Sequence, residues 1–439
     1  MFSARTYTDR RRRLAEAVSS GLILIPGNGE AHMNYRGNTY PFRQDSNFRY
    51  FAGHNCPNLV LTIDAATGEG TLYGDDFTLD DIVWMGEQPA VADLAKDCSM
   101  TYGGTLDKLS NDLAKADKVH YLPPYRESRR RQLRDWLGHS DQASVPLIRG
   151  VVALRSVKSE GEIAEMDKAV FISMRMHAAA RDTAKTGMTE ASVAGLIEGI
   201  AISAGGRLAY PAIVTRNGHI LHNHYHGNEL KRGDLLLVDA GAETGSGYAG
   251  DITRTFSIGG ELSEKQRPIY ETVEIAKTQC IRALRPGVPY REIHDLSARI
   301  ITEGLKDLGL MKGDIGEAVA AGAHALFYPH GLGHMIGLDV HDMEDLGEDY
   351  VGYDKTIGRS EQFGTRNLRL GRRLQEGFAI TVEPGIYFIP KLIDQWKAEG
   401  LHKDFINYQA IEDYRKFGGI RLEDNVVITE DNCRVLGSV

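Results

Sequence analysis

Four acidic residues in the second half of this chain stand inside or directly beside apolar, strand-forming runs. Asp239 follows Leu-Leu-Leu-Val, and Asp251 precedes Ile-Thr-Arg-Thr-Phe. Glu383 follows Ala-Ile-Thr-Val, and Glu423 follows Gly-Ile-Arg-Leu. Asp is depleted in strands, and a buried carboxylate without a partner is costly. Divalent cations with oxygen ligands would give these carboxylates a common partner.

The first two carboxylates flank a glycine-rich turn. Asp239 and Asp251 are equidistant from Gly245, so a hairpin folded about that residue places them opposite each other on one face. Their Cβ atoms would then be about 5 Å apart. Two carboxylates this close repel each other unless a cation lies between them. The alternative is that both are solvated carboxylates at loop edges, and the hairpin alone leaves both interpretations open.

The other two carboxylates lie on two later strands. Pro384 follows Glu383 directly and would end the strand pairing there, as is typical of a site at a strand end. Arg421 and Glu423 alternate with apolar neighbours, so they share one face of their strand. A surface ion pair between Arg421 and Glu423 is the simpler alternative.

Two glycine-rich segments and a histidine cluster add imidazoles. They are His330-Gly-Leu-Gly-His334, Leu338-Asp-Val-His341 and His222-Asn-His224-Tyr-His226. Alternate histidines also occur in amidohydrolase barrels, but we find no βα repeat in this sequence. One imidazole with four carboxylates suits two hard or borderline divalent ions. Two such ions about 3.5–4 Å apart can activate a water molecule and polarise a carbonyl group, which predicts hydrolysis of an amide or ester.

Other function classes are disfavoured by motif and charge. The sequence has no phosphate-binding loop of the Walker type, no dinucleotide fingerprint, no H-E-x-x-H zinc motif and no G-x-S-x-G elbow. The net charge of -9 argues against nucleic acid as a partner. No apolar run approaches the ~18 residues that span a membrane. Basic runs at 10–13 and 129–131 are interpreted as solvated helix faces.

The cysteines favour a reducing compartment. Four of them are scattered without a CxxC pair, and the N-terminus lacks the apolar core of a secretory signal. We therefore expect a cytoplasmic protein.

Two domains are expected. Residues 1–157 alternate strand-like and helical runs, including a hairpin between 59–63 and 71–73, and are expected to form an α/β domain. Ser159 and Glu162 then form a capping box that starts a helix. Residues 158–439 are expected to form a larger α+β domain, with helices at 162–185, 189–204, 263–284, 289–308 and 314–323, and antiparallel strands at 234–242, 250–258, 377–383 and 418–429.

The ordered motifs VDAG, GDITRTF, HGLGHMIGLDVHD, TVEPGIY and GGIRLEDNVVIT resemble those of the pita-bread metallopeptidases, in the aminopeptidase P and prolidase branch. The stretch YPFRQDSNFRYFAG, which begins at Tyr40, resembles the N-terminal domain of the aminopeptidase P group. The resemblance therefore covers nearly the whole chain. It implies a creatinase-type α/β domain followed by a catalytic pita-bread domain.

The resemblance also implies a role for each residue. Asp239 would bind one metal and His334 the other, with Asp251 and Glu423 bridging. Glu383 would bind the second metal and also act as general base or proton shuttle. The remaining roles fall on the cleft: His222, or His224 in a shifted alignment, holds substrate; His330 lines the cleft; His341 contacts the scissile carbonyl; and Arg421 lies at the proline end. The family metals are usually Mn²⁺, with Co²⁺ or Zn²⁺ as substitutes.

The implied activity is hydrolysis of the bond before proline, which releases the N-terminal residue of Xaa-Pro peptides. That bond is a tertiary amide without an N–H group, so a general protease is poorly suited to it. A homodimer or homotetramer is implied as well. Expanded segments at 342–376 and 388–417, the latter like that of bacterial prolidases, leave an Xaa-Pro dipeptidase as the alternative. A methionine aminopeptidase, a metal-free creatinase-like hydrolase and a non-enzymatic binding module are weaker alternatives.

Overall fold

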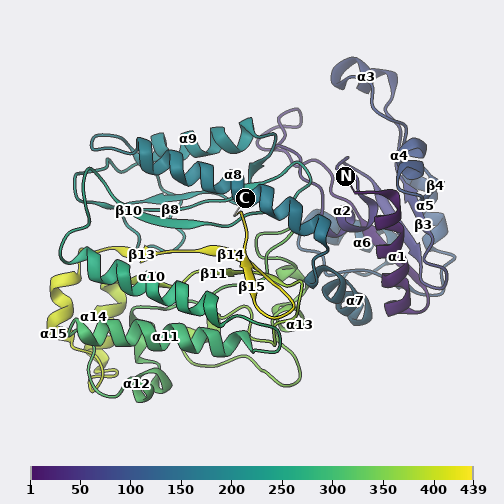
Figure 1. Cartoon of the computed structure of the whole chain (residues 1–439). Coiled ribbons are helices and arrows are strands. Elements are labelled where there is room, and N and C mark those ends of the chain that lie inside the picture. The colour runs from purple at the N-terminus through teal and green to yellow at the C-terminus, as the bar shows by residue number, and fades with distance from the viewer. Residues whose placement is uncertain (1, 438–439) are drawn as a thin grey trace. The chain divides into compact units, whose positions relative to one another are not determined.

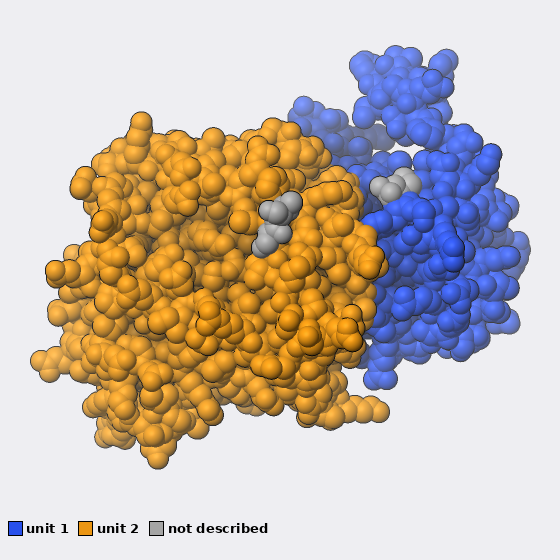
Figure 2. Space-filling model, in the orientation of Figure 1, with its two compact units in different colours: residues 1–155, 345–350 blue, residues 156–344, 351–439 orange. Residues whose placement is uncertain are grey.

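The computed structural model describes residues 2–437 and contains two compact units (Figure 2). Unit 1 comprises residues 1–155 and 345–350, and unit 2 comprises residues 156–344 and 351–439. Among the described residues, no helix is both long enough and apolar enough to cross a membrane.

Unit 1 is built on a five-stranded sheet in the order β4-β3-β2-β1-β5. β1 pairs antiparallel with β2 and parallel with β5, and the predicted hairpin between β2 and β3 is present. The strands are β1 (Leu22–Pro26), β2 (Val60–Asp64), β3 (Gly70–Tyr73), β4 (Thr101–Gly104) and β5 (Val119–His120). The helices are α1 (Ala4–Val18), α2 (Ser46–Ala52), α3 (Leu79–Met85), α4 (Val91–Asp97), α5 (Leu106–Leu113), α6 (Glu127–Leu137) and α7 (Val145–Ser156).

Part of the predicted solvated face of α1 is buried, so that prediction is wrong for two arginines. Arg11 is 1% exposed and donates hydrogen bonds to the carbonyl oxygens of Phe51 (2.9 Å) and Cys98 (2.8 Å). These carbonyls end α2 and follow α4, where helix carbonyls lack an intrahelical partner. Arg10 is also buried and stacks on Tyr50, 3.8 Å from the ring centroid. Arg11 is therefore buried by carbonyl groups at the ends of two other helices, and Arg10 is buried against an aromatic ring of α2.

Helix α3 projects from unit 1 (Figure 1) and has no buried residue. Its apolar side chains are open, with Leu79 79% and Trp84 77% exposed. A capping box between Thr78 and Asp81 closes its first turn. Local backbone bonds rather than core packing therefore hold this helix.

Unit 2 places small sheets between two helix pairs, with α8 and α9 on one side and α10 and α11 on the other (Figure 1). The sheets have the orders β10-β8-β7, β11-β14-β15, β12-β13 and β6-β9. The strands are β6 (Arg207–Leu208), β7 (Ile213–Thr215), β8 (Leu235–Asp239), β9 (Ala242–Glu243), β10 (Thr253–Ser257), β11 (Ala379–Val382), β12 (Gly385–Tyr387), β13 (Gly419–Arg421), β14 (Asp424–Ile428) and β15 (Cys433–Val435).

The helices of unit 2 follow the predicted pattern, and the capping box of Ser159 and Glu162 starts α8 as expected. Apolar side chains of the long helices pack on the strands to form two cores, for example Ile197 on Val238 and Ile269 near Ile420. The helices are α8 (Glu160–Thr183), α9 (Glu190–Ser203), α10 (Gln266–Ala283), α11 (Tyr290–Asp307), α12 (Ile315–Ala321), α14 (Pro390–Glu399) and α15 (Tyr408–Ile411), whereas α13 (Glu348–Val351) lies mostly in the 345–350 segment that belongs to unit 1. Short 3₁₀ turns are η1 (Ala323–Leu326), η2 (Glu344–Leu346), η3 (Thr365–Asn367) and η4 (Glu412–Tyr414).

The predicted single strand at 418–429 is instead two strands that pair with different partners. β13 pairs with β12, and β14 pairs with β11. The break falls at Leu422 and Glu423, opposite Glu383 and Pro384 on the facing segment. Proline cannot donate to a ladder, so the pairing changes partner there. Both glutamates therefore lie at a break between two sheets, and the backbone of neither residue belongs to either strand pairing.

Candidate metal centre

The first two carboxylates meet through a register that differs from the predicted one. Asp239 pairs with Thr253, so Asp251 lies just before β10 rather than opposite Asp239. β8 also pairs with β7 on its other edge, so it is the central strand of this sheet. The carboxylates are nevertheless close, because the Tyr210 hydroxyl donates to Asp239 Oδ1 (2.6 Å) and also lies in hydrogen-bonding contact with Asp251 Oδ1.

The structure brings all of the predicted site residues to one cavity of about 500 Å³ in unit 2. The cavity lining includes the five predicted ligands together with the predicted cleft residues and the competing histidine: Asp239, Asp251, His334, Glu383, Glu423, His222, His224, His330, His341 and Arg421. These side chains come from segments up to 201 positions apart, between 222 and 423.

Three of these residues lie within ligand distance of a common point. Asp251, His334 and Glu423 are buried, and each offers a ligand atom within 4.8 Å of the others. His334 Nε2 lies 3.5 Å from Asp251 Oδ2 and 3.5 Å from Glu383 Oε1. Its Nδ1 faces the backbone oxygen of Met335 at 3.0 Å, which fixes the ring and leaves Nε2 toward the carboxylates.

A buried carboxylate oxygen of Glu423 indicates whether a cation fits this site. Glu423 is 1% exposed; its Oε2 accepts a hydrogen bond from Thr253 Oγ1 (2.7 Å), while its Oε1 has no hydrogen-bond partner among the described residues. An unsatisfied buried carboxylate oxygen is costly. Carboxylate oxygens and one imidazole nitrogen are a donor set for hard or borderline divalent ions. The residues therefore fit a divalent metal.

The electrostatics of the cluster give the same result. Burial raises the pKa of Glu383 to about 7, although His334 opposes this change. Burial, together with the nearby charge of Asp251, raises the pKa of Glu423 well above its ordinary value. Carboxyl groups that resist ionisation in this way are stabilised as carboxylates by a bound cation.

Arg421 neutralises part of the cluster from the other side. It is 4% exposed and donates to Asp239 Oδ2 (2.6 Å) and to the Tyr387 hydroxyl (2.9 Å). Asp239 is thus held by both Arg421 and Tyr210, which positions its carboxylate at the cavity. The alternative of a surface ion pair between Arg421 and Glu423 is wrong, because both side chains are buried.

Two histidines line the cavity wall in fixed orientations. His330 Nε2 lies 2.9 Å from the Tyr387 hydroxyl, and burial lowers the pKa of His330 to about 3. His341 Nδ1 lies 2.5 Å from Glu344 Oε2, and burial lowers the pKa of His341 to about 2. The His341 ring centroid is 4.0 Å from that of His334. Burial therefore favours the neutral form of both imidazoles, while the Glu344 carboxylate favours the charged form of His341.

His222 and His224 are both exposed and both line the cavity, so the choice between them stays open. Sequence reasoning missed Tyr210, Tyr387 and Arg369, which also contact or line the site. Arg369 pairs with Glu344, the partner of His341. No spacing pattern singles out these residues. The one sequence signal that covers Arg369 is the expanded 342–376 segment, in which it lies.

Comparison with known proteins identifies the fold. The profile of metallopeptidase family M24 matches residues 164–430, and that of the aminopeptidase P N-terminal domain matches residues 7–120. A protein named "Probable Xaa-Pro aminopeptidase pepP" from Botryotinia fuckeliana is 34% identical, over 95% of this chain and 87% of that protein. The Xaa-Pro dipeptidase of Homo sapiens is 30% identical, over 98% and 90%.

Solved structures agree over the whole length. Aminopeptidase P from E. coli, solved with the inhibitor Pro-Leu, matches with a TM-score of 0.80 and 30% identity, over 100% of this chain and 95% of that one. Aminopeptidase PepP of Pseudomonas aeruginosa matches with a TM-score of 0.82 and 28% identity, over 99% and 95%. The expected fold class is thereby confirmed. The chain belongs to metallopeptidase family M24, and it is a metalloenzyme with an aminopeptidase P-type N-terminal domain ahead of its pita-bread catalytic domain.

Proposed function

We propose that this protein is an Xaa-Pro aminopeptidase, which hydrolyses the peptide bond before proline and releases the N-terminal residue. The observation that carries the proposal is the convergence of four carboxylates and His334 on one cavity, with a buried oxygen of Glu423 left without a partner. Relatives with this activity in their names align over nearly the whole chain.

Five side chains would hold two divalent cations. Asp251 and Glu423 would be shared, Asp239 would bind one ion, and His334 with Glu383 would bind the other. When bound, the pair supplies an activated water molecule and polarises the scissile carbonyl group. We propose Mn²⁺ as the native metal, with Co²⁺ or Zn²⁺ as substitutes.

The chain's own residues would then manage protons and position the substrate. A buried carboxyl with a pKa of about 7 suits Glu383 to take up and return a proton near neutral pH. Glu344 holds His341 through Nδ1, so the other ring nitrogen is the atom that would meet the scissile carbonyl. It would donate there from the protonated ring, a form that the adjacent Glu344 carboxylate favours. Because the bond before proline has no N–H, recognition would use the proline ring, against His330 and Arg421, and His222 or His224 on the substrate side.

A peptide panel tests this function. With added Mn²⁺, the purified protein should release Ala from Ala-Pro-Ala but leave Ala-Ala-Ala intact, and a chelator should stop the reaction. Equal cleavage of both tripeptides would contradict proline specificity.

The alternative is an Xaa-Pro dipeptidase. It is favoured by Arg369, a cation in the cavity lining whose side chain is 34% exposed and able to meet a free α-carboxylate. Cleavage of Ala-Pro together with failure on Ala-Pro-Ala would establish this alternative. Human Xaa-Pro dipeptidase aligns over 98% of the chain, so both lengths of substrate belong in the panel.

We further propose a cytoplasmic homodimer or homotetramer. The four cysteines are free, as expected in a reducing compartment. Light scattering on the purified protein tests the assembly, since a monomer at micromolar concentration would contradict it.

A further inference from the structure

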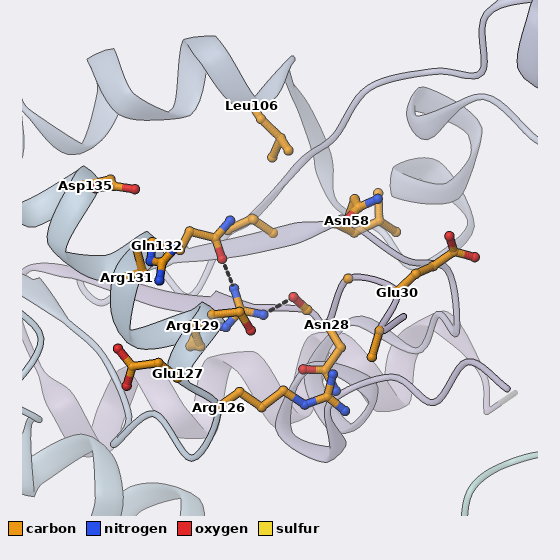
Figure 3. A pocket seen from close by; sticks show the side chains of 16 residues that line it. Asn28, Glu30, Asn58, Leu106, Arg126, Glu127, Arg129, Arg131, Gln132 and Asp135 are labelled. Carbon is orange, nitrogen blue, oxygen red and sulfur yellow. Dashed lines mark hydrogen bonds between the residues drawn. The ribbon is translucent and has the colours of Figure 1, made fainter. Parts of the chain in front are cut away.

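A second cavity, of about 730 Å³, lies wholly within unit 1 (Figure 3). It opens where the parallel neighbours β1 and β5 end. Its walls are residues 27–31, which follow β1, and the beginning of α6, which is the next helix after β5. In open α/β sheets, the crevice beyond the carboxyl ends of parallel strands is where ligands bind. This cavity is separate from the metal centre, none of whose residues line it.

Arg129 extends its guanidinium into this cavity and forms no ion pair with any described carboxylate. Two of its N–H groups are used, one by Gln132 Oε1 (2.5 Å) and one by the backbone oxygen of Gly27. Both acceptors are neutral, and a guanidinium has five N–H donors. Among residues 2–437, no carboxylate forms an ion pair with Arg129, although burial lowers its pKa. The charge of Asp45 acts on the Arg129 guanidinium only from beyond ion-pair distance, so an anion bound directly to that guanidinium in the cavity would stabilise it further.

Two further arginines surround the same space. Arg126 and Arg131 line the cavity, and within the described part of the chain neither forms an ion pair. The adjacent carboxylate of Glu127 does not neutralise them, because it is engaged by Arg130 (3.7 Å) and Arg134 (3.0 Å). The cavity thus has three guanidinium groups that are available to a ligand.

The remaining lining fits an organic molecule rather than a bare ion. The carboxylates of Glu30 and Asp135 lie on either side of Arg129 in Figure 3, at the borders of the cavity. Leu59 and Leu106 supply apolar wall, and the amide of Gln132 supplies hydrogen-bonding groups. Such a combination accommodates a carbon skeleton that carries a planar or tetrahedral oxyanion.

We propose that this cavity binds a small organic oxyanion, a carboxylate or a phosphate ester, whose charged group pairs with Arg129 between Arg126 and Arg131. Arginine is suited to this role because its planar fork matches both kinds of oxyanion. The proposal concerns a site apart from the metal centre and does not depend on peptidase activity.

Titration calorimetry on the purified metal-loaded protein tests the proposal with two probes, glycerol phosphate and succinate. The variants are Arg129→Gln, the double variant Arg126→Gln/Arg131→Gln, and Arg13→Gln as a matched control on α1 of the same unit, at an exposed position outside the cavity. We expect saturable binding of at least one probe, which identifies the oxyanion class. Affinity should fall at least tenfold in both cavity variants and stay unchanged in the control.

Three results would overturn the proposal: no saturable binding of either probe at millimolar concentration, equal binding to all variants, or an equal loss in the control. If a probe binds at the metal centre instead, its affinity will be the same in every arginine variant, and that result would contradict the proposal. Because Arg129→Gln also removes two internal hydrogen bonds, the double variant, which keeps them, guards against a loss caused by misfolding. Hydrogen exchange should slow on binding in residues 27–31 and 126–132.

Discussion

A buried ion pair behind the metal centre gives the sharpest test of how the site is held. Lys158 Nζ lies 2.8 Å from Asp342 Oδ2, and both side chains are 1% exposed. Asp342 also accepts the backbone N–H of Asp339 (3.1 Å), and its own N–H donates to Met335 O (2.9 Å). These bonds close the loop that runs from His334 to His341. We infer that the ion pair between Lys158 and Asp342 holds this loop in place, and with it the imidazoles of His334 and His341.

Replacing Lys158 with Met keeps the length and apolar volume of the side chain but removes the cation that pairs with the buried Asp342 carboxylate. Breaking a buried pair in this way costs about 3–5 kcal/mol. Urea unfolding should show that loss in the free energy of unfolding. kcat should fall by ~10–100-fold, because side chains that orient metal ligands and the residues around them contribute effects of that size.

The double variant Lys158→Met/Asp342→Asn is the control. Its amide oxygen can still accept the N–H of Asp339, but no buried charge remains. We expect it to recover at least half of the lost stability, as shown by a double-mutant cycle. A single variant that costs less than ~1 kcal/mol, or a double variant no better than the single, would refute this reasoning.

Three further predictions concern metal, pH and packing. Glu423→Gln should reduce metal affinity by ~100-fold or more in elemental analysis, and a chelator should lower the stability of the wild type by about 2.7 kcal/mol if metal was present at a hundred times its Kd; normal metal content in the variant would count against the ligand set. Burial lowers the pKa of His324 to about 4, so the unfolded chain binds its proton first and stability should fall by up to about 3 kcal/mol as pH drops from about 6.5 to 4; His324→Phe should flatten that fall in denaturant titrations at each pH, and an unchanged slope would contradict it. Trp396→Ala, at a 5% exposed core position, should cost about 3–5 kcal/mol, whereas Trp84→Ala, at a 77% exposed position, should change the free energy of unfolding by less than about 0.5 kcal/mol; similar losses would show that the packing is misjudged.

The proposed ligands could be predicted because the signal is local. An acidic residue next to an apolar strand, as at Asp239 or Glu383, violates a strand preference that only a partner can offset. The structure then places these side chains at one cavity. Element types in unit 2 were predictable for the same reason, since long amphipathic stretches carry their period in the sequence.

What the sequence did not reveal depends on partners far away in the chain. The register that sets Thr253 rather than Asp251 against Asp239 appears only in the folded pairing of β8 with β10. The burial of Arg11 depends on helix ends that meet it only after folding. Tyr210 reaches the two aspartates from a loop without any pattern of its own. Contacts of this kind are tertiary, so no window of sequence contains them.

The proposed ligands are spread along the chain from Asp239 to Glu423, and the last of them lies at the break between β13 and β14. During translation, each earlier ligand leaves the ribosome without the partners that would let it retain an ion. The chain would thus bind its metal ions only once β12 and β13 have paired and brought Glu423 to the other ligands. A growing chain of this kind should be unable to trim newly made proteins, and proteolytic fragments that lack either end of the span should be inert.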